Sequence, residues 1–504
     1  MFLSFLITPW ALLALPIFYY VLPYIRNWSI QDVPGPFLAK FSNLWVMYEC
    51  RRCRRYLTVH KLHQKHGKLV RITPNHVSIA DPDAIPVVYG HGTGFLKSEY
   101  YDAFVSIRRG LFNTRDREEH TRKRKTVSHT FSAKSIGQFE QYIHGNLELL
   151  AKQWDRMSKE ADGGFYKFDA LHWFNYVAFD VIGDLAFGAP FGMLEKGQDI
   201  AEVQLKPDAP PTTAPAIEVL NRRGEVSNAL GCMPWLKPYA QYFPDPFFSK
   251  GIEAVQNLAG IAIARVNTRL EQAEKGTIDR VDLLARLMEG KDENGNKLGR
   301  EELTAEALTQ LIAGSDTTSN TSCALLFHCL MHPDVVKKLQ TELDDALPEL
   351  DVPSFDQVKD LPYLQNVIQE TLRIHSTSSQ GLPRVVPPGP GVDLAGRHFP
   401  QGTVLSVPSY VMHHSKEIWG EDADEFRPER WDKVTDRQKS AFIPFSYGPR
   451  ACVGRNVAEM ELALIVSIVF RRYEFELYQD YLETREGFLR KPLGLQVGMR
   501  KRKA

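Results

Sequence analysis

Apolar and polar residues follow a helical period over most of the chain from Arg117 onward. The longest predicted helix runs from about Glu301 to Met331, because acidic residues suit its first turn and His332-Pro333 ends it. It is apolar on nearly all sides around Leu308–Ala313, which is typical of a helix in the core. A further helix is expected over Leu364–Ile374. The pattern predicts a mainly helical fold in one large domain.

Short strands and polar loops interrupt the helices. Val70–Ile79 alternates and carries β-branched residues, which predicts a hairpin, and Asp393–Val407 has strand and turn character. Leu205–Ala216 is rich in proline, and Lys291–Lys297 is polar and turn-forming, so both are predicted as surface loops. The predicted fold class is therefore mainly α with small β-sheets.

The first 25 residues carry no charged side chain, and Arg26 is the first cation. A spanning helix needs about 20 mostly apolar residues, so residues 1–25 are predicted to form a transmembrane anchor. A cleaved signal peptide is the alternative, but its basic residues precede the apolar core, whereas here they follow it. Positive charge after the anchor places the rest of the chain in the cytosol. Residues 26–36 are expected to form a linker with a Pro-rich hinge, and residues 37–504 the folded domain.

Composition and charge narrow the class of protein. Hydrophobic residues make up 43% and charged residues 24% of 504 residues, as in a globular protein able to bury a cofactor. The formal net charge is zero, which gives no reason to expect nucleic acid as a partner. Six cysteines do not make a disulfide framework in a chain of this size. They suggest reduced thiols, one of which could do chemistry.

The strongest chemical signal is FSYGPRACVG, which contains Cys452. Pro449 and the glycines break regular structure before the cysteine, and an apolar helical run starts after Gly454. Backbone N–H groups at a helix N-terminus stabilise a thiolate, which is the form that binds a metal. A lone cysteine is more often a buried structural residue. The residues around Cys452 decide between the two interpretations.

These residues form a complete pattern: Phe445, Gly448, Arg450, Cys452 and Gly454. The pattern resembles the haem-binding signature F-x-x-G-x-R-x-C-x-G of the cytochrome P-450 superfamily at every fixed position. The resemblance implies the cytochrome P-450 fold, with residues 37–504 as a haem-thiolate monooxygenase domain. It also implies haem b (iron protoporphyrin IX) with Cys452 as the iron ligand, next to Phe445, and Arg450 paired with a haem propionate. A thiolate ligand favours cleavage of the O–O bond.

Two more motifs match the same superfamily. The E-x-x-R pair Glu370 and Arg373 is completed there by an arginine in a P-E-R-W segment, here Arg430, and the three are expected to form a buried structural charge network. Within the long helix, the resemblance assigns Thr317 to a hydrogen bond with dioxygen and Asp316 to the relay of protons. A polar kink between packed helices is the alternative for this segment.

Further basic residues match propionate-binding positions of the superfamily. Arg124 fits the arginine of its W-x-x-x-R motif, whereas His120 stands in place of the tryptophan. Arg384, in GLPRVVP, matches another propionate-binding arginine. The neighbouring cations form either a solvated face or a docking site for an acidic reductase: Arg122, Lys123 and Lys125.

Several segments outside the general motifs, among them YGHGTGFLKSEYYDAF and GLPRVVPPG, look like the fungal benzoate para-hydroxylase group. This resemblance implies a small aromatic substrate, benzoate, that is hydroxylated para to its carboxylate. A buried carboxylate must find hydrogen-bond donors, although polar residues in a short stretch can also merely solvate a turn. The candidate substrate residues are Tyr100, Tyr101, Ala313, Ser378, Ser379 and Gln380.

The sequence shows no motif for binding flavin or nicotinamide. The resemblance therefore implies electrons from a separate NADPH-cytochrome P-450 reductase, with O2 as co-substrate, on the endoplasmic reticulum membrane. The expected protein is single-pass, with its catalytic domain in the cytosol. Alternatives are a monooxygenase of another small lipophilic or aromatic compound, a haem-thiolate isomerase or dehydratase that uses no O2, and a non-catalytic haem carrier. Asp316 and Thr317 argue against the last two, which need no oxygen-activating relay.

Overall fold

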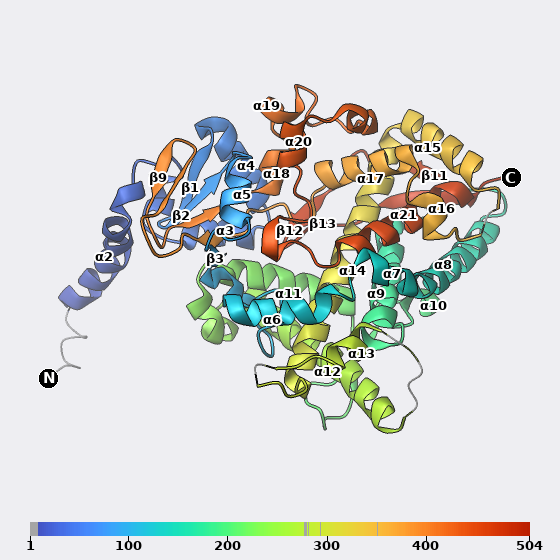
Figure 1. Cartoon of the computed structure of the whole chain (residues 1–504), viewed down its shortest axis with the longest axis horizontal. Coiled ribbons are helices and arrows are strands. Elements are labelled where there is room, and N and C mark those ends of the chain that lie inside the picture. The colour runs from blue at the N-terminus through green and yellow to red at the C-terminus, as the bar shows by residue number, and fades with distance from the viewer. Residues whose placement is uncertain (1–8, 277–279, 281, 293, 350, 504) are drawn as a thin grey trace.

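Helices dominate the computed structural model, which describes residues 9–276, 280, 282–292, 294–349 and 351–503 (Figure 1). The predicted class, mainly α with small sheets, is confirmed. The helices of eight or more residues are α2 (Pro9–Arg26), α3 (Leu44–Arg51), α4 (Arg55–His66), α6 (Arg117–Ser128), α8 (Glu140–Glu160), α9 (Ala170–Phe187), α11 (Ala216–Gly231), α12 (Pro246–Glu274), α14 (Arg300–Met331), α15 (Pro333–Ala346), α17 (Pro362–Ile374) and α21 (Arg455–Arg472), together with the 3₁₀ segment η5 (Pro234–Tyr242).

Helix α14 is the central element of the helical part, and its observed bounds agree with the predicted helix. It packs most extensively against α9. A Cβ atom at Gly314 would come within 2.6 Å of the Ile182 side chain, so this glycine lets the two helices approach closely. The helix runs without interruption through Ala313–Thr318. Gly314 therefore has a packing reason, and the fold places the polar residues of α14 in its core.

The largest sheet lies at the N-terminal end of the molecule and has five strands in the order β1-β2-β10-β7-β3 (Figure 1). The predicted hairpin is confirmed as β1 and β2, and β10 joins β2 in parallel. At the other edge, β3 pairs with β7 so that Lys97 lies opposite Arg384. The strands are β1 (Leu69–Thr73), β2 (His76–Ile79), β3 (Leu96–Lys97), β7 (Arg384–Val385) and β10 (Val404–Ser406).

The remaining sheets are small. One has three strands in the order β11-β14-β4, and three others are two-stranded hairpins. The hairpin β12–β13 reaches back to α14, which it contacts through β13. The strands are β4 (Tyr166–Asp169), β5 (Ala201–Val203), β6 (Thr212–Ala214), β8 (Val392–Leu394), β9 (Arg397–Phe399), β11 (Tyr473–Leu477), β12 (Thr484–Glu486), β13 (Arg490–Pro492) and β14 (Gln496–Lys501).

The Pro-rich segment differs from its prediction. Part of Leu205–Ala216 forms strand β6, which pairs with β5, and only the residues between the two strands form a loop. The pairing is stabilised from outside the segment, because Val203 packs on Gly260 of α12 and the Gln204 N–H donates to the Gly260 carbonyl. A local reading of the prolines could not reveal this support.

The N-terminal helix α2 extends away from the body of the molecule (Figure 1). Pro16 and Pro23 lie inside it. Among the helices of the described residues, none has both the length and the apolar character needed to span a bilayer. The predicted transmembrane anchor thus finds no support in the part of the chain described, and its first eight residues lie outside that part.

Candidate active site

The loop before α21 holds Cys452 in a conformation set by its backbone. The Cys452 N–H donates to the Phe445 carbonyl at 2.9 Å, and the Ala451 N–H donates to the Gly448 carbonyl at 3.0 Å. Gly448 has φ +70°, and a Cβ atom there would come within 2.0 Å of the Tyr89 carbonyl oxygen. Only glycine fits this position, which explains the glycine of the motif. The loop places the cysteine three residues before Arg455, the first residue of α21.

The Cys452 side chain retains accessible surface, although its surroundings are densely packed. Burial raises the pKa of the thiol, while the Gly454 N–H and the charges of Arg124 and Arg455 lower it. Arg124 also donates to the Ala451 carbonyl, next to the cysteine. The protein therefore offers partial support to a thiolate, and a bound metal cation would complete it, because coordination deprotonates a thiol outright.

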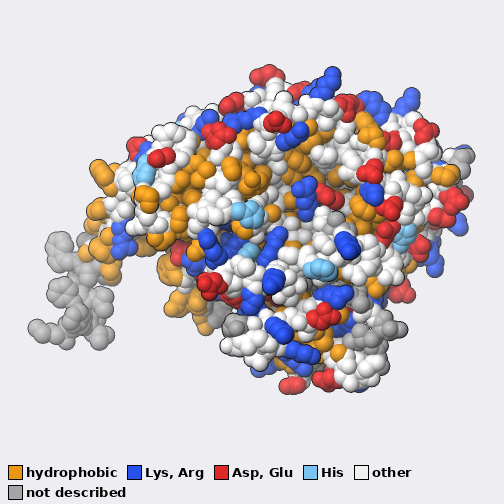
Figure 2. All heavy atoms as spheres, viewed as in Figure 1, with side chains coloured by type: hydrophobic (Ala, Val, Ile, Leu, Met, Phe, Trp, Pro, Cys, Tyr) orange, Lys and Arg blue, Asp and Glu red, His pale blue; other side chains and the backbone are white. Residues whose placement is uncertain are grey.

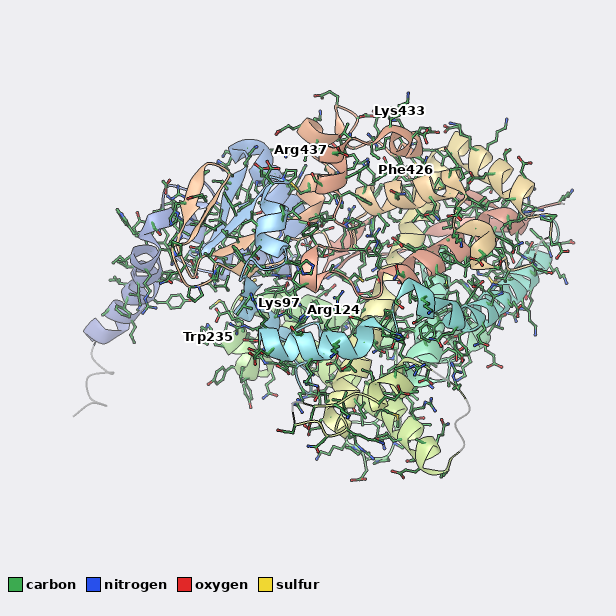
Figure 3. All side chains as sticks on the ribbon, in the orientation of Figure 1. Lys97, Arg124, Trp235, Phe426, Lys433 and Arg437 are labelled. Carbon is green, nitrogen blue, oxygen red and sulfur yellow. The ribbon has the colours of Figure 1, made fainter. Side chains whose placement is uncertain are left out.

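A cluster of five basic side chains lies beside this loop: Lys97, His120, Arg124, Arg384 and Arg450. Lys97 extends from β3 and Arg124 from α6 (Figure 3). Burial and then the charges of the neighbouring arginines hold the pKa of Lys97 well below its usual range. The same causes lower the pKa of His120 to about 3. Burial, followed by the charge of Arg384, lowers the pKa of Arg450 to about 10.

No acid of the described residues pairs with this cluster. Arg450 donates to the carbonyl oxygens of Thr114 and Arg115 at 2.7 and 3.2 Å. Arg384 donates to the Tyr101 hydroxyl at 2.9 Å, and Lys97 to the Phe112 carbonyl. Like charges opposite each other on paired strands are destabilising, and buried cations need an anion. The cluster fits the two propionate groups of a haem, whose iron the Cys452 thiolate would bind.

Lys97 is a member of this cluster that the sequence interpretation missed. It lies within YGHGTGFLKSEYYDAF, the segment that also contains the candidate substrate residues Tyr100 and Tyr101. Its position opposite Arg384 depends on the register of β3 and β7, which are separated by most of the chain. A single lysine between Leu96 and Ser98 was the only local signal.

Asp316 and Thr317 lie in the middle of α14 and face different surroundings. The buried Asp316 carboxylate forms an ion pair with Lys491 of β13 at 2.9 Å. The Thr317 hydroxyl donates to the Ala313 carbonyl at 2.7 Å. Ala313 and Thr317 are one turn apart, and both keep accessible surface in a helix that is otherwise mostly buried. The surface of α14 at Ala313 and Thr317 is therefore accessible, while the Asp316 carboxylate is held by Lys491. Lys491 was not predicted.

The predicted charge network is present. Glu370 pairs with Arg373 at 2.8 Å and with Arg430 at 2.9 Å, and its other oxygen accepts from the Trp431 indole at 2.9 Å. Glu370 and Arg373 have no exposed surface. Burial would raise the pKa of Glu370, but the hydrogen bond and charge of Arg373, with the charge of Arg430, lower it instead. The network satisfies its own charges.

The candidate substrate residues Tyr100, Tyr101 and Gln380 are buried and bonded to other protein groups. The Tyr100 hydroxyl donates to Asn228 at 2.7 Å and accepts from the Gln380 amide at 2.9 Å. The Gln380 carbonyl accepts from Arg55 at 2.8 Å. The Tyr100 hydroxyl and the Gln380 amide therefore donate within the protein, contrary to the expectation that they wait for a substrate carboxylate.

Two serine hydroxyls of the same segment, those of Ser376 and Ser379, are engaged too. The buried Ser379 hydroxyl donates to the Ser376 carbonyl at 2.5 Å. The Ser378 carbonyl accepts from the hydroxyls of Ser376 and Ser409. This bonding corresponds to the alternative interpretation, in which the polar residues stabilise a turn.

Comparison with known proteins agrees with the geometry. The cytochrome P450 family model matches residues 34–499. The chain is 64% identical to benzoate 4-monooxygenase bphA of Aspergillus niger over 99% of each chain. It is 31% identical to cytochrome P450 monooxygenase pkfB of Emericella nidulans, over 93% of this chain and 91% of that one. Because the family model and the relatives cover almost the whole length, this chain belongs to the cytochrome P450 family of haem-thiolate monooxygenases.

Proposed function

We propose that this protein is a benzoate 4-monooxygenase. One atom of O2 enters the ring C–H bond para to the carboxylate, the other leaves as water, and NADPH supplies two electrons. The observation that carries the proposal is the 64% identity, over 99% of both chains, to a relative of that name. At this identity over the full length, the residues around the substrate are expected to be shared in large part.

The chain's own residues have separate tasks in this proposal. Haem b, when bound, supplies the activation of O2. Cys452 provides the thiolate ligand, beside Phe445, and the cationic cluster described above holds the propionates. Thr317 offers a hydroxyl at the accessible face of α14, and Lys491 fixes the carboxylate of Asp316 next to it. The two residues are proposed to deliver protons to the reacting oxygen.

Thr317→Ala tests this assignment. The variant is expected to bind haem normally but to form about 10-fold less product per NADPH consumed than wild type, because proton delivery is impaired. Thr321→Ala, one turn further along α14, is the matched control, since its hydroxyl makes the same kind of bond to the carbonyl four residues earlier. Equal coupling in wild type and Thr317→Ala would remove Thr317 from the mechanism.

We propose that the electrons come from a separate NADPH-cytochrome P-450 reductase. Support comes from the absence of any flavin or nicotinamide motif in the sequence. Basic side chains gather near the centre of the face shown in Figure 2, over α6. Of the three cations weighed as a docking site, only Lys125 is exposed, because Lys123 is buried between Glu302 and Glu306 and Arg122 is ion-paired with Glu302.

We also propose that residues 1–25 tether the protein to the endoplasmic reticulum membrane, with residues 37–504 in the cytosol. The support is the apolar surface of α2, where Ile17, Phe18 and Ile25 are 60 to 63% exposed. Deletion of residues 1–25 should move haem-loaded protein from the membrane to the soluble fraction. An unchanged distribution would contradict the proposal.

The experiment that tests the function uses purified protein with reductase, NADPH and benzoate. We expect a low-to-high-spin shift on adding benzoate, and 4-hydroxybenzoate formed only when NADPH and O2 are both present. An isomerase or dehydratase would turn over without them. Absence of shift and product with benzoate, while another aromatic compound gives both, would reject benzoate and leave the family assignment intact.

A further inference from the structure

Arg223 of α11 is a buried arginine without an acid beside it. Arg223 is 5% exposed, and its Nη2 donates to the Phe104 carbonyl at 3.0 Å. The Nε–H has no hydrogen-bond partner among the described residues. The guanidinium lies 5.3 Å from the centre of the Phe104 ring. A buried donor left unsatisfied is costly, so its presence calls for a ligand.

The charges around Arg223 do not balance it. Burial lowers the pKa of Arg223 to about 10, with Asp316 and Tyr100 acting in the opposite direction, so the guanidinium is charged at neutral pH. Asp316, the acid that acts on it, is already in contact with Lys491 at 2.9 Å. Lys237 is a further cation near Arg223. The region therefore holds an excess of buried positive charge, which an anion would neutralise.

The side chains beside Arg223 are aromatic. Phe104, Phe112 and Phe488 pack edge to face, with ring centroids 5.1 to 5.8 Å apart. Phe112 and Phe488 are only half-buried. Helix α11 contacts the β12–β13 turn closely, since a Cβ atom at Gly487 would come within 3.0 Å of the Glu225 nitrogen. Arg223 and the three rings therefore lie together where α11 meets η3 (Glu99–Phe104) and this turn.

Arg55 and Tyr100, two other buried donors of the region, have acceptors within the protein. Arg55 donates to Gln380 and has the acid Glu486 nearby. Tyr100 and Tyr101 are bonded to protein groups, as described above. The Arg223 Nε–H, by contrast, is buried without any acceptor among the described residues.

We propose that Arg223 binds the carboxylate of the substrate, and that Phe104, Phe112 and Phe488 surround its aromatic ring. The ligand class is a small aromatic carboxylate. A guanidinium forms charge-assisted hydrogen bonds with a carboxylate, and the low-dielectric surroundings strengthen them. The role rests on the proposed function, which it deepens: it explains how a site lined by rings selects an acid over a neutral compound of the same shape.

The test compares benzoate with benzamide, its uncharged analogue, on the haem-loaded full chain. Dissociation constants are measured by equilibrium dialysis and by the spin-state shift for wild type, Arg223→Gln, Arg223→Lys and Arg222→Gln. Arg222 is the matched control, because it is the adjacent residue, exposed, and paired with Glu218 at 2.8 Å. The spectrum of the ferrous–CO adduct reports the fraction of folded, haem-loaded protein.

We expect Arg223→Gln to weaken benzoate binding about 100-fold, since removing one partner of a buried charge pair leaves the other unpaired. Benzamide binding should change by less than about threefold, and Arg222→Gln should match wild type. Arg223→Lys keeps the charge without the planar fork, so benzoate binding should weaken about 10-fold. If Arg223→Gln fails to load haem, the lysine variant decides.

Unchanged benzoate binding in Arg223→Gln, or in Arg223→Lys when that variant decides, would overturn the proposal. Equal losses for benzoate and benzamide would do the same, since they indicate a structural role. The proposed function can fail separately. If wild type binds phenylacetate in an Arg223-dependent manner but does not bind benzoate, the proposed substrate is wrong and the role of Arg223 in carboxylate binding stands. If Arg223→Gln still binds and hydroxylates benzoate normally, the proposed function stands and the role of Arg223 in carboxylate binding is rejected.

Discussion

Two buried groups of basic side chains in this protein have opposite balances of charge. In the Glu370 network, one carboxylate accepts from Arg373 and Arg430, and backbone carbonyls accept the remaining N–H groups. In the cluster around Lys97 and Arg384, the cations meet carbonyl and hydroxyl oxygens but no acid of the described residues. The first group is complete without a ligand and is structural. The second is complete only with an anion, which is the mark of a binding site.

The Cys452 loop lies beside the cluster that lacks an anion, and replacing Cys452 should have the largest effect. Cys452→Ala is expected to abolish the strongly red-shifted Soret band of the ferrous–CO adduct, along with monooxygenase activity, because the axial thiolate is lost. The control is Cys329→Ala, since Cys329 is a buried cysteine whose pKa is also raised by burial. If Cys452→Ala kept the band, the ligand assignment would be wrong.

Removing the acid of the Glu370 network should destabilise the fold. Glu370→Gln removes the carboxylate that two buried arginines share and leaves Arg430 only its longer contact with Asp422, at 3.4 Å. We therefore expect the free energy of unfolding to fall by about 3–5 kcal/mol. The loss should appear with and without haem, in urea denaturation curves. The exposed Glu417→Gln is expected to stay within about 0.5 kcal/mol of wild type. A change as small as that of the control would show that the network does not stabilise the fold.

Glu461 of α21 is a third case, a buried acid without a cation. Burial raises its pKa to about 8 from 4.5, while a hydrogen bond from Thr318 lowers it. The folded state therefore keeps a proton that the unfolded chain releases above pH 4.5, and stability should decline as pH rises from there toward about 8. Glu461→Gln should remove this decline and be a few kcal/mol more stable than wild type at pH 8.5.

The measurement is urea denaturation at several pH values between 5 and 8.5. Glu459→Gln is the control, because Glu459 is paired with Arg455 and 38% exposed. Parallel curves for wild type and Glu461→Gln would contradict the raised pKa.

The smallest expected effect is on the cluster around Lys97, where removing a cation should increase stability and not decrease it. Lys97→Met removes one cation from the cluster around Lys97 and Arg384. The free energy of unfolding of the haem-free protein should therefore rise by about 1 kcal/mol. Haem should leave the variant about 10-fold faster, since a propionate loses a charge-assisted bond. Haem transfer to an acceptor protein and urea denaturation of the haem-free form measure the two effects. Lys125→Met, on the exposed face of α6, should change neither. A destabilised haem-free protein would place Lys97 with the structural group.

The sequence by itself predicted the elements and motifs that depend on near neighbours. The period of α14, the hairpin β1–β2 and the helix α17 follow from local patterns of apolar residues. The Cys452 loop and the Glu370–Arg373 pair follow from short fixed spacings. Such features are readable because backbone preference, helix periodicity and turn geometry act over a few residues.

Only the tertiary structure decided which buried polar groups are satisfied. Lys97 meets Arg384 through strand register, Lys491 meets Asp316 across 175 residues, and Arg223 is left without an acid. The serines of the Ser376–Gln380 segment were predicted as donors to the substrate, yet the Ser376 and Ser379 hydroxyls bond within their own turn and its neighbours. Whether a donor is free depends on every element that packs against it. Side-chain type therefore shows what a residue can bind, and the packed fold determines what remains for it to bind.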